Sequence, residues 1–100
     1  MKQGKSFIAQ LRCKPDRRDE LVGLQIEMKS LVEANEADTL NYELLQSEAD
    51  ENLFICVATF RDDAAFEKHM TIDFHERLVP LIFACLAEDM KIEWFRSLSG

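Results

Sequence analysis

The sequence predicts a single α+β domain whose elements run strand, helix, strand, strand, helix, strand. Three observations predict this order. Four segments alternate apolar and polar residues or are continuously apolar, as strands are. Two longer segments repeat apolar residues at helical spacing, and polar or proline-containing stretches separate the elements. The chain has 100 residues, the usual size of one domain, so we expect residues 1–100 to share one core.

The first strand is expected over residues 6–13, where apolar and polar side chains alternate. Pro15 ends it, because proline cannot donate to a sheet ladder. Asp16 is the predicted N-cap of the following helix, since an aspartate side chain can accept from a free amide of the first turn. This helix of about five turns is amphipathic, with apolar residues at Leu21, Leu24, Met28, Leu31 and Val32.

The second and third strands are expected over residues 39–47 and 53–60, joined by a short polar turn as an antiparallel hairpin. In the second strand, Leu40, Tyr42 and Leu44 are predicted to share one face. The third strand is apolar on both faces. This is typical of a central strand, or of one whose outer face is covered by a partner chain.

The second helical region falls in two segments, residues 64–70 and 73–86. Asp62 and Asp63 are expected to cap the first, and Pro80 is expected to bend the second, because its ring removes one backbone hydrogen bond. Residues 91–98 form the predicted fourth strand, with Trp94 on one face and Phe95 on the other.

This βαββαβ order is that of the ferredoxin-like arrangement, in which both helices cover one face of a four-stranded antiparallel sheet. The other face would then expose apolar side chains to water. A second copy of the chain is the simplest cover. We therefore expect a homodimer packed sheet to sheet, as a dimeric α/β-barrel-like assembly.

Charge and cysteine content exclude several classes of partner. Lys and Arg number 12 against 19 Asp and Glu, a net charge of −7 that repels phosphate backbones, so we expect neither nucleic acid nor a membrane as a partner. No targeting segment is recognisable. Cys13, Cys56 and Cys85 are an odd number at wide spacings, which predicts reduced, buried thiols and a cytoplasmic location.

Three segments resemble one known family. Residues 14–21 (KPDRRDEL) resemble its entry into the first helix, residues 36–44 (EADTLNYEL) are similar to its lead into the second strand, and residues 60–69 (FRDDAAFEKH) resemble its strand-to-helix passage closed by a histidine. The family is the antibiotic biosynthesis monooxygenase (ABM) family, which includes small quinol monooxygenases. The chain departs from it at Ala37–Asp38 in place of Pro-Gly, at Ala58 in place of a glutamate, and at Phe74–His75 in place of His-Phe.

The resemblance places His69 beside a cavity between helix and sheet, where it would act as the catalytic base. Histidine suits this role because its pKa is nearest neutrality. The alternative is a structural histidine that satisfies carbonyls at a helix end.

Five further residues are candidates for substrate contact: Tyr42, Asn41, Arg12, Phe66 and Trp94. Tyr42 and Asn41 are adjacent on one strand and point to opposite faces, so only one of them can line the cavity. Tyr42 is favoured, although a tyrosine that merely packs with its hydroxyl at the rim remains open. Surface ion pairs would explain Arg12 equally well.

No metal or cofactor is expected. His69 and His75 are six residues apart, which places them on different faces of a continuous helix, and only Asp73 could orient His69 from the same region. The chain lacks a glycine-rich phosphate loop. Two functions stay open: a cofactor-independent monooxygenase acting on a small aromatic, quinol-like compound, or a non-catalytic dimeric domain that binds a small hydrophobic ligand.

Overall fold

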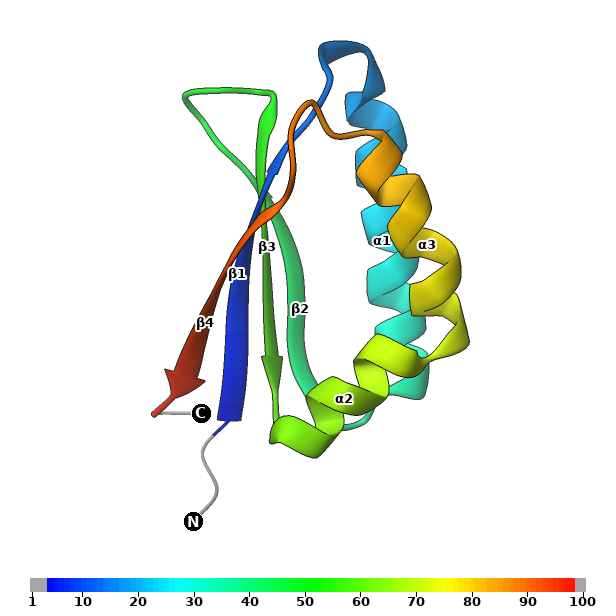
Figure 1. Cartoon of the computed structure of the whole chain (residues 1–100), viewed down its shortest axis with the longest axis vertical. Helices are drawn as coiled ribbons and strands as arrows, with labels where there is room; N and C mark the ends of the chain where they lie inside the picture. Colours follow the sequence, from blue (N-terminus) through cyan, green and yellow to red (C-terminus); the bar gives the residue numbers. More distant parts are fainter. Residues whose placement is uncertain (1–3, 99–100) are drawn as a thin grey trace.

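Three helices cover one face of a four-stranded sheet in the computed structural model, which describes residues 4–98 (Figure 1). The elements are β1 (Gly4–Arg12), a 3-10 turn η1 (Pro15–Arg17), α1 (Arg18–Asn35), β2 (Thr39–Gln46), β3 (Leu53–Phe60), α2 (Asp63–Thr71), α3 (Asp73–Ala84) and β4 (Lys91–Ser97). The long helices α1 and α3 lie side by side, and α2 crosses near one end of the sheet (Figure 1). The predicted α+β class and element order are confirmed.

The sheet has the strand order β2-β3-β1-β4, and every neighbouring pair is antiparallel. β3 is therefore an inner strand, as its apolar character on both faces predicted. β2 and β3 form the predicted hairpin. β4 pairs only with β1 and, like β2, is an edge strand.

The core lies between this sheet face and the helices. Alternate residues of the inner strands point toward the helices, so that Leu11, Phe54 and Phe60 are at most 1% exposed. Leu21 and Met28 of α1 and Leu78 of α3 belong to the same buried cluster. The predicted amphipathic pattern of the first helix is confirmed.

The two helix starts differ in how far the sequence predicted them. Asp62 caps α2 as expected, its Oδ1 accepting from the Ala65 amide at 2.9 Å. Asp16 is not the N-cap of α1. It lies inside η1, and Arg17 occupies the N-cap position without a side-chain hydrogen bond. The preceding Pro15 favours this extra turn, because its fixed φ suits the first position of a helical segment.

A register irregularity corrects the prediction for Leu40. Thr39 pairs with Phe60 and Asn41 with Thr59, so Leu40 is an extra residue in β2 and is 49% exposed. It does not share the buried face with Tyr42.

The three cysteines are free and buried, as expected of small apolar side chains. Within residues 4–98, no helix combines the length and apolarity needed to cross a membrane.

The sheet face away from the helices carries an apolar patch that the described part of the chain leaves uncovered. We call it the outer patch; its members are Ile8, Leu45, Ile55, Val57 and Phe95. Ile8, Leu45 and Phe95 are 39%, 44% and 46% exposed. The predicted two-sided apolar character of the sheet is confirmed.

Candidate functional site

An apolar cavity of about 240 Å³ lies between the sheet and the helices. Its floor is formed by Phe7, Ala9 and Leu11 of β1, and Val79 and Ile82 of α3 form its far wall. Ala9 lies between the larger side chains of Phe7 and Leu11 on the same strand face, and its short side chain leaves space between them. The space is of the size that holds one small ligand.

The mouth of the cavity opens beside the edge strand β4. Four apolar side chains line the cavity and are also more than a third exposed: Met70, Phe83, Ile92 and Trp94. This apolar rim favours an apolar ligand, since a ligand that covers it removes these side chains from water.

His69 stands in the cavity wall and is held by a buried carboxylate. Its Nδ1 lies 3.0 Å from both carboxylate oxygens of Glu36, and the two residues are 2% and 4% exposed. Glu36 is the C-cap of α1, and the Thr39 hydroxyl donates to its Oε1 at 2.7 Å. The end of α1 and the start of β2 thus hold His69 of α2 in place through Glu36.

This contact replaces both structural partners expected for His69. Asp73 does not orient the imidazole, because its Oδ1 accepts from the Phe74 amide at 2.8 Å. The Nδ1 atom also does not serve carbonyls at the end of α2. Glu36 was missed, although it opens the segment of residues 36–44 that resembles the family; 33 positions separate it from His69.

The Glu36–His69 pair has the arrangement of a general base. In a neutral imidazole, the carboxylate keeps the proton on Nδ1, so that Nε2 is the basic nitrogen. Nε2 makes no hydrogen bond to residues 4–98, and His69 lines the cavity. A proton taken at Nε2 would create a cation that Glu36 stabilises directly.

His75 meets His69 at the same wall. The two rings are 4.6 Å apart between centroids and stand edge to face at 71°. The sequence-based expectation that they occupy different faces is therefore wrong. Ile72 adopts an extended conformation that separates α2 from α3, so the two histidines do not belong to one continuous helix.

The pKa of His75 is lowered to about 4, mainly by burial and in smaller part by the neighbouring His69, while Glu36 opposes the shift. The unfolded chain, with a histidine pKa near 6.5, therefore binds more protons than the folded chain between about pH 6.5 and pH 4.

We expect the stability that His75 contributes to be fully present above pH 6.5 and to fall as the pH is lowered through this window. Since His75 is only partly buried, screening reduces the loss to about 1–2 kcal/mol. Urea unfolding of wild type and His75→Phe at pH 7 and pH 4.5 measures this; an equal loss in both proteins would contradict it.

Tyr42 faces the cavity side of the sheet, as predicted. Its hydroxyl is not at the rim: it donates to Gln25 Oε1 at 3.0 Å, and both side chains are buried. Burial raises the pKa of Tyr42 well above its usual value and that of the adjacent Cys56 to about 11. Both groups thus remain protonated near neutral pH and do not act as bases there.

The other candidates divide in two. Phe66 and Trp94 line the cavity, with ring centroids 4.8 Å apart. Asn41 is exposed on the opposite face of β2, opposite Thr59, and lies outside the cavity. Arg12 also lies outside it, because its guanidinium binds Asp50 at 2.8 Å and Glu88 at 3.0 Å. The ion-pair alternative therefore accounts for Arg12.

Across residues 4–98, histidine, cysteine and carboxylate side chains form no group of three that could hold a metal ion. Glu36 and His69 form a pair, and Thr39 is the third group in contact, through its hydroxyl on the carboxylate.

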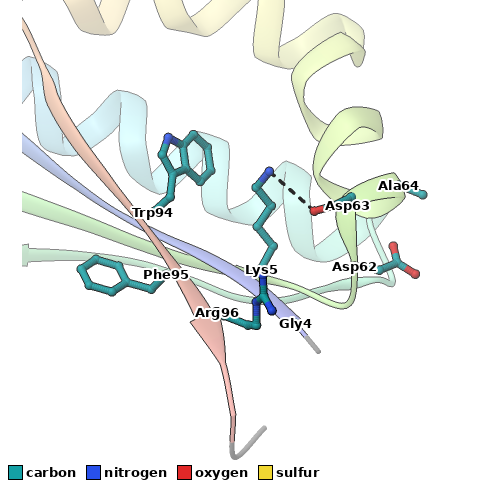
Figure 2. Close-up of a pocket in the computed structure, with 8 residues that line it drawn as sticks. All are labelled: Gly4, Lys5, Asp62, Asp63, Ala64, Trp94, Phe95 and Arg96. Carbon is teal, nitrogen blue, oxygen red and sulfur yellow. Dashed lines mark ion pairs between the residues drawn. The ribbon is translucent and has the colours of Figure 1, made fainter. Parts of the chain in front are cut away.

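A second, wider hollow of about 650 Å³ lies beyond Trp94, which lines both spaces. Figure 2 shows Lys5 reaching from β1 toward Asp63 at the start of α2, with Trp94 and Phe95 on opposite sides of β4. The Lys5 Nζ is 3.6 Å from Asp63 and 4.8 and 4.9 Å from the ring centroids of Phe66 and Trp94. Lys5 therefore makes cation–π contacts with Phe66 and Trp94, two aromatic side chains that also line the inner cavity.

Fold and site together define a ferredoxin-like α+β domain with a buried carboxylate–histidine pair beside an apolar cavity. The family model described as antibiotic biosynthesis monooxygenase matches residues 6–80, and the chain belongs to this ABM family. Members of the family are often monooxygenases. No curated protein sequence matches the chain significantly.

Solved structures agree with this assignment. One named antibiotic biosynthesis monooxygenase is 27% identical, with a TM-score of 0.85 and coverage of 95% of this chain and 99% of the other. A Pseudomonas aeruginosa protein is also 27% identical, with a TM-score of 0.85 and coverage of 99% and 98%. A Caulobacter crescentus protein provisionally named an antibiotic biosynthesis monooxygenase is 19% identical, covers 98% and 92%, and shares the fold at a TM-score of 0.93.

Proposed function

We propose that this chain is a cofactor-independent monooxygenase that oxidises a small hydroxyarene or quinol in the cavity. The observation that carries the proposal is the Glu36–His69 pair, with both Glu36 oxygens 3.0 Å from Nδ1 and with His69 in the wall of an otherwise mainly apolar space. A base in such surroundings can remove a hydroxyl proton. The apolar wall then leaves the resulting anion poorly solvated and electron-rich.

The reaction balances with oxygen as the only second substrate. The hydroxyl proton moves to Nε2 of His69, and the aryloxide anion passes electrons to O₂. One oxygen atom replaces hydrogen on a ring carbon as a carbonyl, and the other leaves as water with the two protons released from the substrate. All four electrons come from the hydroxyarene, and the product is a quinone. Glu36 stabilises the imidazolium while the anion reacts.

Oxygen uptake with a panel of quinols and naphthols tests this proposal. His69→Asn keeps an amide donor near the position of Nδ1 but removes the basic nitrogen, and His69→Ala removes the side chain. Both are expected to lower kcat by about 10²–10⁴-fold. Lys68→Ala is the matched control, because this neighbouring side chain of α2 is exposed and lies outside the cavity. No uptake by wild type, or equal uptake by the His69 variants, would refute the proposal.

A second candidate function is a non-catalytic domain that binds a small hydrophobic ligand. It is favoured by Ala58, which stands where many relatives carry a strand glutamate and is fully buried without a polar group. The first candidate answers this observation with Glu36, which supplies a buried carboxylate from another element. Ligand binding without oxygen consumption would support the second candidate.

A further inference from the structure

The order Phe74–His75 has a consequence in space. Phe74 is 6% exposed and belongs to the core, whereas the next residue, His75, lines the cavity. Adjacent positions on a helix point about 100° apart, so exchanging the two residues would bury the imidazole and give the cavity a phenyl ring. With the order Phe74–His75, the cavity wall carries a second imidazole; with the reverse order it would carry a phenyl ring at the same position.

The two imidazoles differ in how many ring nitrogens are available to a ligand. His69 is fixed by Glu36 and has only Nε2 to offer. The ring of His75 makes no hydrogen bond to other residues within 4–98, and it is partly buried. Because the pKa of His75 is lowered to about 4, its ring is neutral near pH 7 and carries one donor and one acceptor nitrogen.

The spacing of the two rings limits what they can bind together. Their centroids are 4.6 Å apart and both rings line the cavity, so one small ligand at this wall can contact both imidazoles. Two oxygens on neighbouring carbons of an aromatic ring point to the same side and can meet both imidazoles at once. Oxygens at para positions point in opposite directions, and only one of them can face the pair.

We propose that His75 is a second ligand-contacting residue and that the cavity selects aromatic ligands with oxygen substituents on neighbouring carbons. This inference rests on the proposed function, since it assigns one of the two oxygens to His69. The second ring of a bicyclic ligand lies at the apolar mouth, against side chains such as Phe83 and Trp94.

Anaerobic binding tests the selection without turnover. The probes are 1,2-dihydroxynaphthalene, 1,4-dihydroxynaphthalene and 1-naphthol, and dissociation constants come from NMR titration of the wild type, His75→Phe and His75→Gln. In the wild type, we expect the 1,2-isomer to bind about 3- to 10-fold more tightly than either other probe, as one additional hydrogen bond allows. His75→Phe is expected to bring this ratio close to one, and His75→Gln, which keeps a donor and an acceptor, to retain part of it.

The outcomes separate the two proposals. If 1-naphthol binds the wild type, but the 1,2-isomer gains nothing or keeps its advantage in His75→Phe, the selection by His75 is wrong and the proposed function stands. If no probe binds the wild type, both are wrong. An advantage that disappears in His75→Phe and returns in His75→Gln supports the inference, because loss of folding alone would not restore it.

Discussion

Glu36→Ala is expected to lower the free energy of unfolding by roughly 2–4 kcal/mol, which is a large part of the stability of a domain of this size. The reason is what the substitution leaves behind. His69 is 2% exposed and would lose the acceptor of its Nδ1 proton in a place that water reaches poorly. The Thr39 hydroxyl would lose its acceptor as well, and with it the contact that joins the end of α1 to β2.

Urea unfolding followed by circular dichroism measures this loss. Glu33→Ala is the matched control, because Glu33 lies on the same helix, is 64% exposed and has only a weak 4.0 Å contact with Lys29. We expect this control to unfold almost as the wild type does. Equal midpoints for the two variants would show that the buried pair contributes little.

Glu36→Gln separates stability from chemistry. Glutamine has nearly the same shape, and its oxygen can still accept from His69 and Thr39, so most of the stability should be retained. It carries no charge to stabilise an imidazolium. Oxygen uptake by a folded Glu36→Gln variant is therefore expected to fall by about 10-fold or more.

Local patterns predicted the fold well because the elements are defined by local physics. β3 occupies residues 53–60 as expected, and Asp62 caps α2 through a contact three residues away. The prediction for Asp16 was wrong for a local reason too, since Pro15 opens a 3-10 turn that moves the N-cap of α1 by one residue, to Arg17. Leu40 failed because alternation cannot reveal an extra residue in a strand.

The candidate site was less predictable, because its decisive contacts are not local. The family resemblance pointed to His69, and the face of its strand favoured Tyr42; both line the cavity. Glu36 required knowledge of how the end of α1 meets α2. The contact between His69 and His75 depends on one extended residue, Ile72, which redirects the second helix.

The outer patch leads to the second prediction with a large effect. Its residues come from all four strands, and Ile8 and Val57 stand opposite each other at its centre on the two inner strands. A monomer would leave these apolar side chains in water. Glu43 pairs with Val57 and Glu93 with Ile8, so the two outer strands place carboxylates on either side of the apolar centre. We expect two copies to associate through this face, burying the same residues from both sides.

Ile8→Glu is expected to abolish this association. A carboxylate at the centre of an apolar interface would be buried without a partner, and the symmetry of a dimer would bring two such groups close together. The dissociation constant should rise about 100-fold or more. Sedimentation equilibrium measures it: the wild type should show twice the chain mass of 11.6 kDa, and the variant a single chain.

Ile26→Glu provides the control, because Ile26 is an isoleucine of α1 that is 59% exposed and remote from the sheet. It receives the same charge and should remain dimeric. A wild type with the mass of one chain, or an Ile26→Glu variant that dissociates equally, would refute association through the outer patch.

The cavity opens beside β4 on the helix side of the sheet, whereas Ile8 points to the other side. Ile8→Glu therefore also tests whether oxygen uptake requires the dimer. We expect uptake per chain to persist in the folded variant, because every residue assigned to proton transfer and ligand contact comes from one chain.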